Sequence, residues 1–134
     1  TSWVYSEYGK NFVKTMVKLL SEKEEINVVD DQVGSPTYAA DLSSVILHII
    51  SSQYWQPGIY HYSNQGIISW YDFAMAIKQI KGSKCIVNPI PSSQYPTPAK
   101  RPAYSVLDTA KIQSTFGIEL KNWEESLANC LVNL

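Results

Sequence analysis

The chain has 134 residues, of which 45% are hydrophobic, and this length and composition fit one domain with one core. Its 11 basic and 12 acidic residues give a formal net charge of -1, which provides no electrostatic attraction to nucleic acid or anionic membranes. No apolar run approaches the length that spans a bilayer, and no signal-peptide pattern precedes Thr1. We therefore expect a cytoplasmic protein that binds neither nucleic acid nor membrane.

The first half of the chain alternates strand and helix patterns. Residues 1–5 predict a strand, and the apolar positions from Phe12 to Leu20 recur at helical spacing. The charged residues 22–25 indicate a solvated helix end or the start of a loop. Residues 26–29 are mostly β-branched and predict a buried strand. A second helix is predicted over residues 39–51 by the spacing of Leu42, Val45, Ile46, Ile49 and Ile50.

In the second half, residues 58–62 and 85–90 predict strands on either side of a helix. That helix begins with a capping box formed by Ser69 and Asp72 and ends near Gly82. The regular alternation of strands and helices along the chain predicts an α/β fold with at least part of a parallel sheet.

The C-terminal third begins with a predicted extended loop, because five prolines fall between residues 89 and 102. Two short helices follow, the first capped by Asp108 and the second by Asn122 with Glu125. The inward face of the last helix is expected to carry Leu127, Cys130, Leu131 and Leu134.

The loop at residues 30–38, between a strand and a helix, is a candidate ligand site. It offers amides, a carboxamide and hydroxyls on a backbone constrained by Gly34 and Pro36. Such groups hydrogen-bond polar small molecules when their geometry is prepared in advance. An ordinary strand-to-helix turn is the alternative, and spacing alone does not separate the two interpretations.

Other residues with possible chemistry are assigned structural roles. Cys85 and Cys130 lie far apart without a Cys-x-x-Cys motif, so we expect buried thiols and neither a disulfide nor a metal site. His48 and His61 are likewise expected to be structural. Residues 54–73 carry seven aromatic side chains but no Lys or Arg, which favours core packing and cleft lining over a platform for nucleic acid.

Three segments have an order and spacing typical of one known family: residues 1–5 (TSWVY), 31–37 (DQVGSPT) and 100–108 (KRPAYSVLD). Together they resemble the dTDP-4-dehydrorhamnose reductases, which are extended short-chain dehydrogenases/reductases. The resemblance continues through residues 60–64, 69–72 and 122–123. It covers nearly the whole chain but less than half of the family's length.

The resemblance implies the C-terminal portion of an extended short-chain dehydrogenase/reductase (Rossmann-like) fold, with the last part of its parallel sheet and the small substrate-binding lobe. The family's dinucleotide site needs a glycine-rich turn, and its catalytic Tyr has a Lys four residues later. Here the six glycines are isolated, and no Tyr is followed by such a Lys. We therefore expect residues 1–134 to be a single unit, the substrate-binding part of a larger enzyme, without the NAD(P)-binding part and inactive alone.

By the same resemblance, the full-length enzyme reduces the 4-keto group of dTDP-4-dehydro-L-rhamnose with NADPH or NADH to give dTDP-L-rhamnose. The expected partner of this chain is the dTDP-sugar, and apolar surface facing the absent half would favour a homo-oligomer. Two alternatives stay open. One is a non-catalytic sugar-nucleotide-binding or regulatory subunit of the same family, and the other is a different sugar-nucleotide reductase or epimerase.

The resemblance also implies site residues near the N-terminus. Thr1 and Ser2 correspond to positions that approach the nicotinamide cofactor. Trp3 would present its indole to the sugar, and plain core packing is the alternative. Asn11 corresponds to a donor to sugar or phosphate, while a helix cap would use the same side chain.

Further substrate-binding positions follow later in the chain. Arg101 is the only arginine, and its guanidinium would hold the diphosphate, with a surface salt bridge as the alternative. Gln32 and Thr37 would address nucleotide or sugar hydroxyls, and Val29 would pack on the base. We expect no catalytic residue within the chain and assign no metal.

Overall fold

The computed structural model describes residues 1–134 and contains three two-stranded sheets, two of them parallel. The parallel pairs are β1 (Val4–Tyr5) with β4 (Thr37–Tyr38) and β2 (Glu25–Val29) with β6 (Ile86–Ile90), and the antiparallel pair is β3 (Val33–Gly34) with β5 (Ile68–Ser69). These pairings confirm the predicted α/β fold with part of a parallel sheet.

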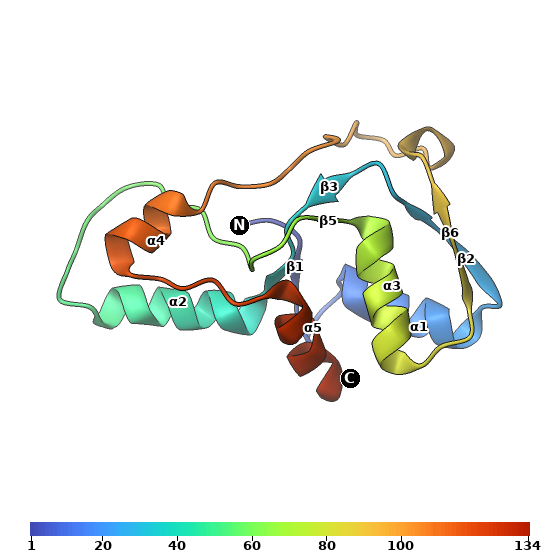
Figure 1. Cartoon of the computed structure of the whole chain (residues 1–134), viewed down its shortest axis with the longest axis horizontal. Helices are drawn as coiled ribbons and strands as arrows, with labels where there is room; N and C mark the ends of the chain where they lie inside the picture. The colour runs from blue at the N-terminus through green and yellow to red at the C-terminus, as the bar shows by residue number, and fades with distance from the viewer.

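The chain also forms five α-helices and one 3₁₀ turn. They are α1 (Phe12–Glu22), α2 (Ala39–Ser51), α3 (Trp70–Lys81), η1 (Ser92–Gln94), α4 (Ala110–Phe116) and α5 (Trp123–Val132). Figure 1 shows an elongated molecule with α2 and α4 at one end and α1, α3, β2 and β6 at the other. The two-residue strands and α5 lie between these groups.

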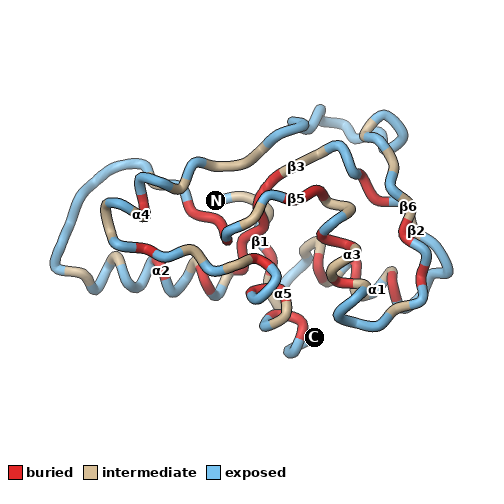
Figure 2. Tube along the Cα trace, in the orientation of Figure 1, coloured by how far each residue is buried: buried red, intermediate tan, exposed pale blue.

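The main core lies where α1 and α3 pack on the strands. Figure 2 shows buried residues on α1, α3 and β1, whereas the loop that follows α2 is exposed. Aromatic contacts stabilise this core, because Phe73 packs edge-on against Tyr5 and Trp123 and stacks on Phe12. A smaller cluster joins α2 to the C-terminal segment and comprises Val45, Tyr62, Ile112 and Ile118.

Local signals in the sequence set the helix ends. The side chain of Asn11 accepts a hydrogen bond from the backbone N–H of Lys14 at the start of α1. Ser69 and Asp72 form the predicted capping box of α3, and Gly82 ends that helix at φ +63°. The predicted helix over residues 39–51 is confirmed at both ends.

Other expectations were wrong. Residues 58–62 form no strand, because no neighbouring segment pairs with their backbone, and the hydroxyl of Tyr60 instead donates to the carbonyl of Gln56 at 3.0 Å. The first strand covers only Val4–Tyr5 of the predicted residues 1–5. Leu134 does not face inward, since 39% of it is exposed.

The caps of the last two helices differ in part from the prediction. Asp108 accepts a hydrogen bond from the N–H of Ala110 at 2.8 Å, although Thr109 occupies the cap position itself. Asn122 caps α5 through the N–H of Glu124. Cys85 and Cys130 are buried, as predicted. No helix combines the length and apolar character needed to cross a membrane.

Candidate functional site

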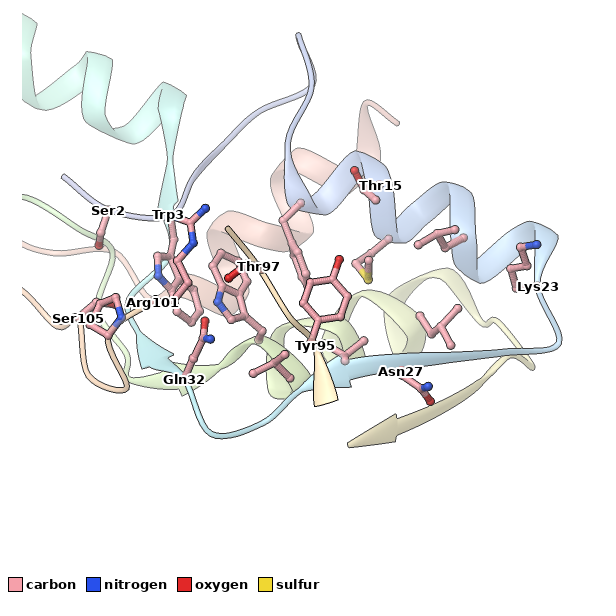
Figure 3. Close-up of a pocket in the computed structure, with 18 of the residues that line it drawn as sticks. Ser2, Trp3, Thr15, Lys23, Asn27, Gln32, Tyr95, Thr97, Arg101 and Ser105 are labelled. Carbon is pink, nitrogen blue, oxygen red and sulfur yellow. The ribbon is translucent and has the colours of Figure 1, made fainter. Parts of the chain in front are cut away.

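A cavity of about 910 Å³ runs along α1 and β2, and residues of the proline-rich loop form part of its lining (Figure 3). Its walls come from segments that are far apart in the sequence. The residues that line it are Ser2, Trp3, Phe12, Thr15, Met16, Leu19, Lys23, Glu25, Ile26, Asn27, Val28, Val29, Gln32, Trp70, Tyr95, Thr97, Arg101, Pro102 and Ser105.

The two ends of the cavity differ in chemistry. Figure 3 shows Trp3, Gln32 and Arg101 gathered at one end, whereas Lys23 and Asn27 lie at the other. The first end combines an aromatic face, an amide and a permanent cation. This combination suits a ligand that has both a flat or ring-shaped part and a negative charge.

Trp3 occupies an unusual backbone conformation at this end of the cavity. Its φ of +48° makes it the only non-glycine residue with positive φ. Its carbonyl accepts a hydrogen bond from the N–H of Thr37 at 3.2 Å, which links it to the first residue of β4. The Trp3 indole stacks on that of Trp70, with ring centroids 3.6 Å apart and planes 10° from parallel.

Gly34 makes room for this indole. A Cβ atom at position 34 would lie 2.6 Å from Cε2 of Trp3 and 2.7 Å from Oγ of Ser105, both far inside van der Waals contact. The backbone of β3 therefore approaches the ring at a distance that no side chain permits. The glycine at position 34 therefore contributes to the cavity, because its missing side chain leaves room for the Trp3 indole in the cavity wall.

Arg101 is exposed and makes no hydrogen bond or salt bridge within the protein. The loop that carries it is held to β3, since the N–H of Val33 donates to the carbonyl of Ala103 and the N–H of Ser105 donates to the carbonyl of Val33, both at 2.8 Å. The guanidinium thus lines the same cavity as the Trp3 indole, and its N–H donors are available to a ligand.

The side chain of Gln32 is held in place by a neighbouring residue. Its amide nitrogen donates to Oγ of Ser92 at 2.8 Å, and its amide oxygen makes no hydrogen bond within the protein. Hydrogen bonds from the side chain and the backbone N–H of Ser92 hold the pKa of Asp31 below its ordinary value. These contacts fix the turn after β2, and Val29, at the end of that strand, lines the cavity.

Of the eight residues predicted to bind ligands, five line the cavity: Ser2, Trp3, Val29, Gln32 and Arg101. The other three lie outside the lining. Oγ1 of Thr1 donates to Oγ1 of Thr37 at 3.0 Å, so these two hydroxyls pair with each other. Asn11 caps α1, and its amide also donates to the carbonyl of Ser6 at 2.8 Å. The structure therefore gives Asn11 the capping role that was left open as the alternative.

The other fourteen of the 19 lining residues were not predicted, and four of them show why. Trp70 is the first residue of α3, and its place inside the capping box was the only signal that fixed its position. Tyr95 and Thr97 stand between prolines in a loop that the sequence shows to be extended but does not orient. Ser105 follows Arg101 by four residues and donates from Oγ to the carbonyl of Val33 at 3.1 Å.

Comparison with known proteins identifies relatives of this chain. The family model described as RmlD substrate binding domain matches residues 1–134. The dTDP-4-dehydrorhamnose reductase of Aggregatibacter actinomycetemcomitans is 44% identical over 139 residues, which cover 96% of this chain and 47% of that protein. The chain therefore spans about half the length of the curated relatives that it matches.

Solved structures agree with this match. The crystal structure of a dTDP-4-dehydrorhamnose reductase from Clostridium acetobutylicum aligns with a TM-score of 0.91 and 41% identity, over 98% of this chain and 46% of that one. The reductase of Bacillus anthracis in complex with NADP aligns with a TM-score of 0.88 and 40% identity, over 97% and 45% respectively. The fold is that of the C-terminal portion of these extended short-chain dehydrogenases/reductases.

Proposed function

The chain belongs to the RmlD substrate binding domain family, and from this membership we propose that it is the substrate-binding part of an NAD(P)H-dependent dTDP-4-dehydrorhamnose reductase. The full-length enzyme would act in the cytoplasm and reduce the 4-keto group of dTDP-4-dehydro-L-rhamnose to give dTDP-L-rhamnose. Residues 1–134 would act as a single unit that binds the dTDP-sugar, while the remainder of the enzyme supplies the NAD(P)-binding part and the catalytic Tyr and Lys.

The observation that carries this proposal is the convergence of Trp3, Gln32 and Arg101 at one end of the cavity. A sugar nucleotide presents ring faces, hydroxyls and a diphosphate. An indole packs well on a ring face, an amide oxygen accepts from a hydroxyl, and a guanidinium forms paired hydrogen bonds with phosphate oxygens. The three side chains therefore match three parts of one ligand.

The role of this chain in the reaction would be to bind and orient the substrate. Holding the 4-keto carbon beside the hydride donor removes much of the entropic cost of bringing two reactants together. The exposed Arg101 guanidinium would hold the charged end of the substrate, and the Trp3 indole would set the position of the ring. None of the side chains in the cavity is needed as the proton donor in this scheme.

The nicotinamide cofactor supplies hydride transfer when it is bound. The residues of this chain fit a contact at the edge of the cofactor site. The side chain of Ser2 lines the cavity next to Trp3, and its hydroxyl donates to the carbonyl of Ser35 at 3.0 Å, so its oxygen remains able to accept. We propose that Ser2, with Thr1 beside it, borders the cofactor, which is NADPH or NADH.

Binding of dTDP and UDP to the full-length protein, measured by isothermal titration calorimetry, tests the proposal. We expect dTDP to bind more tightly than UDP, and Arg101→Ala to weaken dTDP binding by about 10- to 100-fold, because a hydrogen-bonded charge is lost. Lys100→Ala is the matched control, since Lys100 is an exposed cation beside Arg101 that does not line the cavity. Equal affinities of wild type and Arg101→Ala would contradict the role of Arg101.

The same protein separates the proposed enzyme from its alternatives. We expect the full-length protein to reduce the 4-keto sugar nucleotide with NAD(P)H. The loss of nicotinamide absorbance measures this reaction. Tight dTDP binding without reduction would instead identify a non-catalytic binding subunit. Tighter binding of UDP than of dTDP would indicate an enzyme of another sugar nucleotide.

A further inference from the structure

The backbone of Trp3 is held in a conformation that tryptophan rarely adopts. A positive φ crowds the Cβ atom of an L-residue against the neighbouring backbone, so this conformation persists only where the surroundings impose it. Strained residues of this kind gather at binding sites, and Trp3 lines the cavity. The contacts that impose the conformation should therefore be visible around the indole.

The closest of these contacts is the face-to-face stack on Trp70. The ring centroids are 3.6 Å apart and the planes differ by 10°. Trp70 is itself braced, because the Phe12 ring lies 4.6 Å from it at a tilt of 46°. It is also the first residue of α3, between the two capping-box residues Ser69 and Asp72. The stack thus connects the Trp3 indole to the fixed end of a helix.

The indole also makes a second contact, with the backbone of β3. The hydrogen of Gly34 faces Trp3 where a Cβ atom would lie 2.6 Å from Cε2 and 2.7 Å from Cζ2. Gly34 has no positive φ, so its lack of a side chain is needed for this approach and not for its own backbone. The missing side chain at position 34 and the aromatic ring at position 70 therefore both border the indole in its observed place.

We propose that Trp70 is a positioning residue that holds Trp3 in its ligand-facing orientation. The missing side chain of Gly34 leaves the space that the indole occupies. This inference rests on the proposed function, since it assigns Trp3 to substrate binding. Trp70 acts through Trp3, so its replacement lowers affinity only while Trp3 is present. The capping box of α3 thereby serves the ligand site as well as the helix.

Circular dichroism and dTDP binding by the full-length protein together test the inference. Two indoles in contact couple their excited states and give a pair of bands of opposite sign, which reports the Trp3–Trp70 stack without any ligand. We expect Trp70→Ala to abolish this signal and to weaken dTDP binding by roughly three- to tenfold, the range typical of aromatic pairs. Trp70→Phe keeps an aromatic partner, so it loses the signal but retains most of the affinity.

Trp55→Phe is the matched control, because Trp55 is exposed and distant from the cavity lining. It should change neither the paired bands nor the affinity. Gly34→Ala should reduce the paired bands and the affinity although Trp70 is intact. Urea unfolding of each variant shows whether a loss of binding reflects a loss of fold.

A double-mutant comparison separates positioning from direct contact. If Trp70 acts through Trp3, then Trp70→Ala causes no further loss of affinity in a Trp3→Ala background. An equal loss in both backgrounds would overturn the inference, as would unchanged binding by Trp70→Ala after the paired bands have disappeared. Failure of the wild-type protein to bind dTDP would instead contradict the proposed function, whatever the state of the stack.

Discussion

The hydroxyl of Tyr5 is a buried polar group without a hydrogen-bond partner. Only 1% of the residue is exposed, and its ring packs against Tyr38 and Phe73 with centroids 5.5 and 5.4 Å away. Burial, with smaller effects of nearby Cys130 and Asp41, raises the pKa of this phenol, which therefore stays neutral at physiological pH. An unpaired hydroxyl in the core opposes folding, because its hydrogen bond to water is not replaced.

Removal of this hydroxyl should therefore not destabilise the protein. We expect Tyr5→Phe to leave the free energy of unfolding unchanged or to raise it by up to about 1 kcal/mol, as measured by urea denaturation. Tyr38→Phe is the matched control, since the Tyr38 hydroxyl donates to the carboxylate of Glu7, and its loss should cost about 1 kcal/mol. A clear loss of stability in Tyr5→Phe would reveal a partner for the hydroxyl, such as an ordered water.

The positive φ of Trp3 shows where sequence interpretation ends at the scale of single residues. Its place in the site followed from resemblance, because the segment at residues 1–5 matches a known family. Its backbone conformation did not, since tryptophan has no preference for positive φ and the contacts around Trp3, among them Gly34, Trp70 and the N–H of Thr37, come from distant parts of the chain. The helix caps at Asn11 and Ser69 could be predicted from the sequence, because both side chains bind backbone groups within four residues.

Among the elements, helices could be predicted and very short strands could not. The helix at residues 39–51 follows from a periodic apolar pattern that spans its whole length. Strands β3, β4 and β5 have two residues each, which is too few for an alternating pattern. The predicted strand at residues 58–62 was wrong for a related reason. A strand needs a neighbouring strand to pair with, and no strand of this chain pairs with these residues.

Helix α2 carries an apolar face that the protein itself does not cover. Ile46, Leu47 and Ile50 lie at positions i, i+1 and i+4, so they share one side of the helix. All three are exposed, Ile50 by 66%. Tyr54 and Trp55, in the loop that follows the helix, are also exposed. An exposed apolar helix face of this kind promotes association in water.

We expect the 134-residue protein to self-associate at high concentration and Ile50→Glu to reduce this tendency, because a charge in the centre of the face opposes its burial. Sedimentation velocity over a range of concentrations measures the effect. Val132→Glu is the matched control, since Val132 is 84% exposed but lies at the end of α5, away from α2. Monomeric wild type throughout that range, or equal effects of both variants, would contradict this expectation.

For the molecule as a whole, resemblance identified the order of the binding segments, but the cavity between them is a property of the folded chain. Arg101 and Gln32 are 69 residues apart in the sequence and meet only because residues 103–105 hydrogen-bond to Val33. Tyr95 and Thr97 of the same loop also line the cavity. Such long-range backbone contacts leave no periodic signal, and so no local pattern predicts which loop residues face the ligand.

A buried polar cluster around Asp41 connects α2, the segment before β5, and α5. Asp41 lies in α2, Asn64 in the segment before β5, and Ser126 in α5. The carboxylate accepts from Nδ2 of Asn64 at 2.9 Å and from Oγ of Ser126 at 2.6 Å. Lys121 completes the cluster with a salt bridge of 2.6 Å. Asn64 in turn accepts from the N–H of Tyr38 at 2.7 Å, so the cluster also reaches β4.

This cluster should make stability depend on pH in the acidic range. Burial alone would raise the pKa of Asp41, but the hydrogen bonds from Lys121, Ser126 and Asn64 outweigh it, so the pKa lies below its ordinary value. A carboxyl with a lowered folded-state pKa stabilises the fold fully above the unfolded-state pKa of about 3.9. That stabilisation is lost as the pH falls from about 4 through the folded-state pKa, because the proton then binds both states.

Asp41→Asn should therefore lower the free energy of unfolding by about 2 kcal/mol at pH 7, a value below that of fully buried pairs because Lys121 is largely exposed. The difference between wild type and variant should shrink as the pH falls below 4, since the protonated wild type also lacks the charge. Urea denaturation at several pH values between 7 and 2.5 measures both effects. Glu119→Gln removes an exposed carboxylate without hydrogen bonds and should leave the pH profile unchanged. A constant difference between wild type and Asp41→Asn at all pH values would mean that the charge of Asp41 contributes nothing to this junction.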